Sequence, residues 1–128
     1  MSSPAGFLEF FVLEASDYIE QIDALVSRAG SLGPDASSLQ RAARALRGSA
    51  TMAKLPAFAE LAGAVERVGR ALRDNALRWE PAVSSALIAA VDDLKMLVRA
   101  ARDWSPAQTQ RASARAAELA RLAPEHAA

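Results

Sequence analysis

The stretch that decides the fold spans residues 41–53 and reads Arg-Ala-Ala-Arg-Ala-Leu-Arg-Gly-Ser-Ala-Thr-Met-Ala. Its apolar residues recur at steps of three and four, which predicts an amphipathic helix with one buried face. Gly48 stands in the middle of that helix, where glycine costs about 1 kcal/mol relative to alanine. Such a glycine indicates either close approach of another molecule or an inherited position without a present role.

The exposed face of this helix is expected to be basic. Steps of three, four and seven residues from Arg44 lead to Arg47, Gly48 and Thr51, so these four residues share one face. Arg41 extends the arginines into a stripe beside Gly48. Two interpretations stay open: a solvated face that helps neighbouring helices attract one another, or a docking surface for an acidic partner.

Turn and capping signals divide the rest of the chain into further helices. Residues 30–34 form a connector with Asp35 as the N-cap of the next helix, and Ser105-Pro106 is an N-cap followed by a proline in the first turn. We treat residues 1–128 as one domain, with helices expected at about 4–29, 36–53, 56–78, 81–103 and 106–122.

The apolar stripes of these helices predict how they pack. Burial is expected at Phe7, Phe11, Tyr18, Ile22, Leu25 and Ala29; at Leu39, Ala42 or Ala43, Leu46 and Ala50; at Phe58, Leu61, Ala62, Val65, Val68 and Leu72; at Val83, Leu87, Val91, Leu94 and Val98; and at Leu119 and Leu122. Four long amphipathic helices with short connections predict an all-α, antiparallel up-down four-helix bundle. The thinner fifth helix is expected to pack outside the bundle or to be partly ordered.

Composition excludes several classes of protein. The chain has 15 basic and 15 acidic residues, is 52% hydrophobic and contains no cysteine. A basic nucleic-acid-binding tail, a disordered segment, disulfides and thiolate metal sites are therefore not expected. No apolar run is long enough to span a membrane, and the N-terminus lacks a secretory signal pattern. We expect a cytoplasmic protein that neither binds nucleic acid nor inserts into membranes.

Enzyme chemistry has little support in the sequence. The single histidine, His126, lies close to the end of the chain, where catalytic geometry is hard to hold. Asp92 and Asp93 are adjacent on a helix and therefore point about 100° apart, so they cannot hold one metal ion or one proton between them. Without a phosphate loop or a dinucleotide motif, we expect no enzyme activity, no metal and no cofactor.

The stretch at residues 41–50 resembles the signature of histidine-phosphotransfer (HPt) domains. The residues that fit the signature are Arg41, Ala42, Ala43, Ala45, Leu46, Gly48, Ser49 and Ala50. Arg47 stands where the family usually has lysine, and Arg44 stands where it has the phosphorylated histidine. Residues 7–20 resemble the first helix of the N-terminal phosphotransfer domain of chemotaxis kinases, and Glu66 matches a glutamate that ends the segment after the site.

This resemblance implies a signalling module of a two-component or chemotaxis-like phosphorelay. Its partners would be a response-regulator receiver domain, a histidine kinase or both. A guanidinium stays protonated and offers no lone pair to a phosphoryl group, so Arg44 predicts a degenerate, non-catalytic member.

Binding would use the face formed by Arg41, Arg44, Arg47, Gly48 and Thr51. Glu66 would support this face or simply pair with Arg70 one turn along its own helix. Two alternatives remain. The chain is a homodimerising scaffold in which the motif is only ancestral, or it is a phosphotransfer domain that uses another acceptor.

Overall fold

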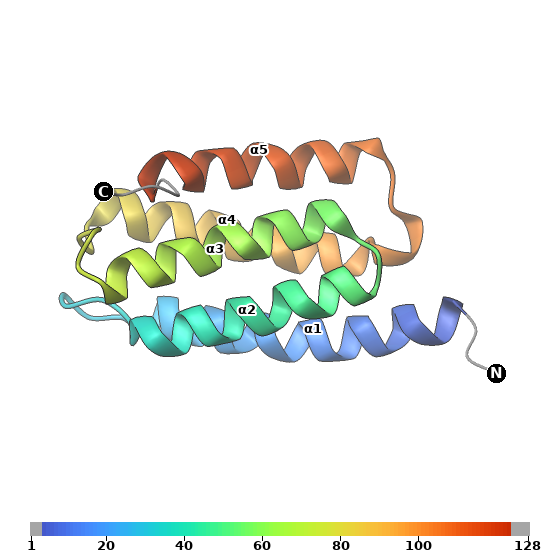
Figure 1. Cartoon of the computed structure of the whole chain (residues 1–128), viewed down its shortest axis with the longest axis horizontal. Coiled ribbons are helices and arrows are strands. Elements are labelled where there is room, and N and C mark those ends of the chain that lie inside the picture. Colours follow the sequence, from blue (N-terminus) through green and yellow to red (C-terminus); the bar gives the residue numbers. More distant parts are fainter. Residues whose placement is uncertain (1–3, 124–128) are drawn as a thin grey trace.

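The computed structural model describes residues 4–123, which fold into five α-helices and one short 3-10 helix. The helices are α1 (Pro4–Ser27), α2 (Ala36–Met52), α3 (Pro56–Arg73), α4 (Pro81–Arg99), η1 (Ala101–Asp103) and α5 (Pro106–Leu122). Helices α1 to α4 run alternately up and down, and α1 also contacts α4, so the four close into a bundle (Figure 1). The prediction of an all-α antiparallel bundle is therefore confirmed.

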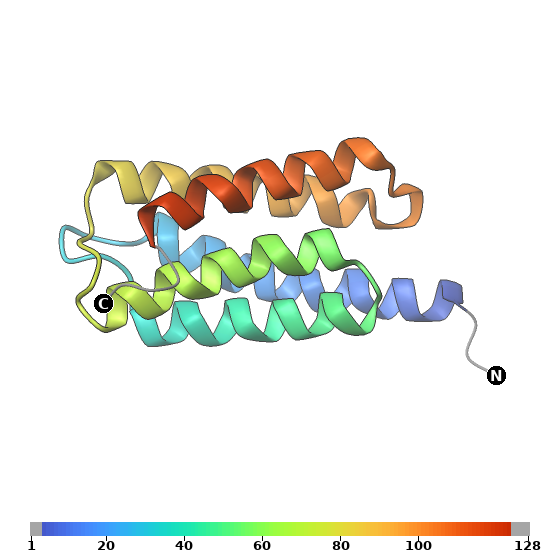
Figure 2. The same cartoon turned by 45° about the horizontal axis from the view of Figure 1, so that its top comes forward.

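Helix α5 lies outside the bundle and packs on both α3 and α4 (Figure 2). Its buried side chains are Ala112, Ala116 and Leu119. Because two of these are alanines, α5 can approach the bundle closely with little apolar bulk of its own. In the described range, no helix is long and apolar enough to cross a membrane.

The core is filled by one stripe from each helix. Near the end of the bundle where α2 connects to α3, the rings of Phe11 and Phe58 meet edge to face, with centroids 5.2 Å apart and planes at 85°. This edge-to-face arrangement is a favourable one for two aromatic rings. The stripes expected on α2 and α4 are fully buried, whereas Leu72 of α3 and Leu122 of α5 are only half-buried.

The stripe expected on α1 is partly wrong. Phe7 is 54% exposed, and Tyr18, Leu25 and Ala29 are only half-buried. The residues that α1 buries are Phe11, Ala15, Ile19, Ile22 and Val26. Helix α1 begins beyond the connection between α2 and α3 (Figure 1), so no neighbouring helix covers its first turn.

The N-caps of α2 and α5 are as predicted. Asp35 accepts a hydrogen bond from the backbone N–H of Ser38 at 3.1 Å. Ser105 forms a capping box with Gln108 before Pro106. These two caps satisfy backbone donors that a helix start otherwise leaves unpaired.

Four helices end earlier than the sequence predicts: at Ser27, Met52, Arg73 and Arg99 rather than near residues 29, 53, 78 and 103. The largest difference is at α3, where Asn75 turns into the left-handed region with φ 58°. The N–H of Ala76 then donates to the carbonyl of Ala71 at 2.8 Å, which closes a Schellman motif. At α4, residues 101–103 form the separate turn η1 instead of continuing the helix.

Helix α2 ends in the same way, with Lys54 at φ 63° and the N–H of Leu55 donating to the carbonyl of Ala50 at 3.0 Å. Glycine is the usual residue at this left-handed position. Because lysine and asparagine occupy it here, the sequence carries no glycine to mark where α2 and α3 end.

Candidate functional site

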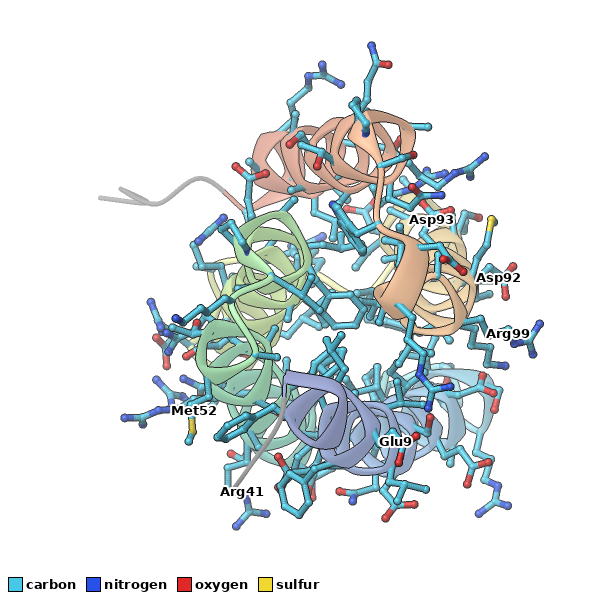
Figure 3. The ribbon with its side chains drawn as sticks, turned by 90° about the vertical axis from the view of Figure 1, so that its right-hand side faces the viewer. Glu9, Arg41, Met52, Asp92, Asp93 and Arg99 are labelled. Carbon is cyan, nitrogen blue, oxygen red and sulfur yellow. The ribbon has the colours of Figure 1, made fainter. Side chains whose placement is uncertain are left out.

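The outer face of α2 carries arginines that the fold does not use. Arg44 is exposed, and its guanidinium forms no ion pair or hydrogen bond with any other residue that the structure describes. Arg41 is exposed as well and has only a contact with its own helix, a 3.3 Å hydrogen bond from Nη2 to Ser38 Oγ. Figure 3 shows Arg41 and Met52 projecting outward on the same side of the bundle.

Gly48 lies on this face and has no internal reason to be glycine. A Cβ added there would meet no heavy atom within 4 Å, and the backbone is that of a regular helix. Gly69 of α3 is the opposite case, because its Cβ would lie 3.0 Å from the backbone nitrogen of Gln40 in α2. Gly69 thus permits the close contact of α2 with α3, whereas no packing contact among the described residues requires a glycine at Gly48.

Arg47 is drawn away from the basic stripe and ties α2 to α3. Its Nε donates to Oε1 of Glu66 at 2.7 Å, and the Glu66 side chain is only 6% exposed. Arg70 reaches the other carboxylate oxygen at 3.5 Å, so the expected pair with Glu66 is present but is the looser of the two. Gly63 makes room, since a Cβ there would come within 3.2 Å of Arg47 Cδ. Of the three arginines in the stripe, Arg47 is therefore held by a carboxylate, whereas Arg41 and Arg44 pair with no acid among residues 4–123.

Thr51 is exposed at the end of the same face. Its hydroxyl donates to the backbone carbonyl of Arg47 at 2.9 Å, a bond within its own helix. The hydroxyl proton is thus engaged, whereas the hydroxyl oxygen can still accept a hydrogen bond and the side chain stays exposed. Of the six residues predicted for the site, the structure joins Arg47 and Glu66 directly and places Arg41, Arg44, Gly48 and Thr51 along one exposed face.

Three exposed apolar side chains on α1 and α2 were not predicted from the sequence. Phe10 and Leu13 of α1 are 64% and 71% exposed, and Met52 at the end of α2 is 80% exposed. The signal was present, because Phe10, Leu13 and Asp17 repeat at steps of three and four on the side of α1 away from Phe11. A surface with several large apolar side chains often marks a binding site.

The two adjacent aspartates of α4 have unrelated surroundings. Asp92 is exposed, whereas Asp93 is buried and lies between α4 and α5 (Figure 3), where it accepts hydrogen bonds from Arg111 and Arg115. Among the described residues no group of three or more histidine, aspartate or glutamate side chains is placed to hold a metal ion. His126 lies outside the described residues.

Comparison with known proteins gives one match. The family model described as "Hpt domain" matches residues 6–104, from the first turn of α1 to the end of η1, and leaves α5 outside the match. No curated protein and no solved structure matches the chain.

Proposed function

The chain belongs to the Hpt domain family, whose members are phosphorelay modules, and we propose that it binds a phosphorelay partner without accepting phosphate itself. The observation that supports this most is Arg44. By the resemblance at residues 41–50 it stands where the family has the phosphorylated histidine, it is exposed, and it has no partner within residues 4–123.

The chemistry of the position favours a lost acceptor. Phosphotransfer to a histidine needs the lone pair of a neutral imidazole nitrogen, and a guanidinium has no such lone pair at any ordinary pH. Ser49 is buried, and the hydroxyl of Thr51 is bonded to its own helix. Neither has a histidine among the described residues to act as a base.

The surface that remains suits a partner with an acidic recess. Arg44 is a free cation, and Gly48, one turn along, lowers the surface beside it. Receiver domains, the usual partners of the family, carry acidic side chains around their phosphorylated aspartate. Arg44 would enter that acidic site as a stoichiometric plug, and opposite charges would favour the encounter. A histidine kinase is the other partner class that the family offers.

Calorimetric titration tests the binding. Each receiver domain of the source cell is titrated in turn into the chain, and Arg44→Glu and Gly48→Gln should each weaken the binding about tenfold or more, because one reverses the charge and the other fills the low point. Arg99→Glu is the matched control, since Arg99 is an exposed arginine on α4, away from this face (Figure 3). If the unaltered chain and all three variants bound the receiver domain with equal affinity, the docking face would lie elsewhere.

Phosphoramidate, which phosphorylates histidine chemically, tests the lost acceptor. The attacking imidazole nitrogen forms a bond to phosphorus, the P–N bond of phosphoramidate breaks, ammonia leaves, and the ring loses its N–H proton. In a His126→Ala background the chain should gain no acid-labile phosphate, whereas Arg44→His in the same background should gain about one per chain. Acid-labile phosphate on the chain that keeps Arg44 would overturn the proposal.

A further inference from the structure

Helices α1 and α2 together form one outer layer of the bundle. An open groove of about 730 Å³ runs between them and is lined by Gln21 and Leu25 of α1 and by Ser38 and Arg41 of α2. The two helices are antiparallel, so the middle of α1 is level with the first half of α2. The first half of α1 is therefore level with the second half of α2.

The two helices of this layer turn opposite charges to solvent. Asp17 and Glu20 are exposed on α1, and Arg41 and Arg44 are exposed on α2. In the described part of the chain, none of the four takes part in an ion pair. They point outward from neighbouring helices, so a second surface laid on the layer would reach all four.

On each helix, the two charged residues belong to a row along the exposed surface that uncharged residues continue. On α1, Phe10 and Leu13 precede Asp17 and Glu20 at steps of three and four residues. On α2, Met52 and Gly48 continue the row of Arg44 and Arg41, also at steps of three and four. Each row is thus apolar at one end and charged at the other, and in the antiparallel pair the two apolar ends are level.

We propose that the α1–α2 layer binds a second copy of this chain about a two-fold axis parallel to the helices. That rotation lays α1 of each copy over α2 of the other without moving either along the axis. Phe10 then meets Met52 of the second copy, and Leu13 meets the low point at Gly48. Asp17 meets Arg44, and Glu20 meets Arg41. Every contact occurs twice, because a two-fold interface is self-complementary.

The rows match in chemistry as well as in position. Leu13 fits over Gly48 of the second copy, where α2 has no side chain. The exposed apolar side chains of both copies are removed from water in the same interface. The charged pairs fix the register, because sliding one copy along the axis would set charges against apolar groups. Reversing one copy would lay α1 over α1 and α2 over α2, which brings like charges together. These pairs stay close to solvent, so added salt should weaken the dimer.

Arg44 and Gly48 belong to both this interface and the proposed docking face. Self-association therefore competes with receiver binding, and only this competition rests on the proposed function. The dimer itself depends on the chain alone.

Sedimentation velocity of the full chain, from about 1 µM to about 1 mM at low and at high salt, measures the dimer directly. The dimer fraction should rise with protein concentration and fall with salt. Asp17→Arg and Arg44→Asp should each raise the dissociation constant about tenfold or more, because like charges then meet twice. The double variant Asp17→Arg/Arg44→Asp exchanges the charges and should restore the dimer. Leu13→Gln should weaken it without a change of charge.

The matched control is Asp92→Arg/Arg99→Asp, an exchange of two exposed charges on α4 (Figure 3), which should leave the dimer unchanged. A chain that stays monomeric at every concentration, a dimer that Asp17→Arg does not weaken, or a double variant that fails to restore it would each overturn the proposal. Asp17→Arg leaves α2 intact, so receiver binding by this variant separates failure of the dimer from failure of the proposed function.

Discussion

Two arginines of α5 and two arginines of α2 have opposite surroundings. Arg111 and Arg115 lie one turn apart on α5 and hold the same carboxylate, with Nη1 of Arg111 3.0 Å from Asp93 Oδ1 and Nε of Arg115 2.7 Å from Oδ2. The side chain of Asp93 is only 5% exposed. Arg41 and Arg44 lie about one turn apart on α2 and pair with no acid among residues 4–123.

The difference arises from the neighbouring helix rather than from the arginines. Helix α4 offers α5 a buried carboxylate, and the hydrogen bond to Asp93 raises the pKa of Arg115. No acid of α1 pairs with Arg41 or Arg44 in the described part of the chain, so these two arginines of α2 stay without an ion pair. Arginines on two helices of one chain can thus hold a buried acid in one place and stay exposed on the proposed docking face in another, and the presence of a carboxylate on the neighbouring helix decides which.

Removing both arginines of each pair should give the largest difference in the free energy of unfolding between α5 and α2. Arg111→Met/Arg115→Met leaves Asp93 buried without a cation and should lower the free energy of unfolding by about 3 kcal/mol. Arg41→Met/Arg44→Met should change it by less than about 0.5 kcal/mol, because both side chains are exposed. Urea denaturation measures both, and equal losses would contradict the comparison.

Gly69 and Gly48 allow a second comparison between a position that the packing of the helices requires and one that it does not. Gly69→Ala should lower the free energy of unfolding by about 2 kcal/mol, because the new Cβ would press on the backbone of Gln40 and push α2 from α3. Gly48→Ala should raise it by about 0.5–1 kcal/mol, because space is open and alanine is the better helix former. Thermal denaturation gives the sign of both, and a destabilised Gly48→Ala would mean that the fold requires this glycine.

Arg47 should behave as an intermediate between the two groups. Arg47→Met removes the 2.7 Å contact to Glu66 but leaves Arg70 beside the carboxylate. Because Arg47 is half-buried and the carboxylate keeps a second cation, the expected loss is about 1 kcal/mol. A loss as large as that of the α5 pair would show that Arg70 does not compensate. The same urea titration measures it.

The smallest effect is expected at the exposed pair Arg73–Asp74. The hydrogen bond from Arg73 lowers the pKa of Asp74, and desolvation opposes this shift. A carboxyl whose pKa is lowered on folding stabilises the fold above its unfolded pKa and loses that contribution as pH falls through the lower value. An NMR titration should place the pKa of Asp74 below the ordinary value of an aspartate, and Arg73→Gln should move the pKa back up.

Local signals predicted much of this fold, and contacts between helices account for what the sequence missed. Asp35 and Ser105 act on their own helix starts, so their roles follow from a few neighbouring residues. The burial of Phe7 depended on whether another helix reaches the first turn of α1, which spacing along one helix does not determine. The end of α3 was missed because Asn75, not glycine, takes the left-handed position.

The candidate site divides in the same way. The periodicity of α2 predicted which residues share its outer face, and Arg41, Arg44, Gly48 and Thr51 do lie there. It did not predict that Arg47 leaves the stripe, because Glu66 belongs to another helix and the contact needs the space at Gly63. The exposure of Phe10 and Leu13 was likewise a property of the assembled bundle.

The position of α5 has a practical consequence for measurements on this protein. Because α5 covers α3 and α4, its outward side lies across the bundle from the α1–α2 layer (Figure 1). Ala117 is exposed on that outward side. A cysteine introduced at Ala117 would carry a dye or a surface tether far from Arg44 and Gly48. An immobilised chain would then present the α1–α2 layer to solution in a single orientation.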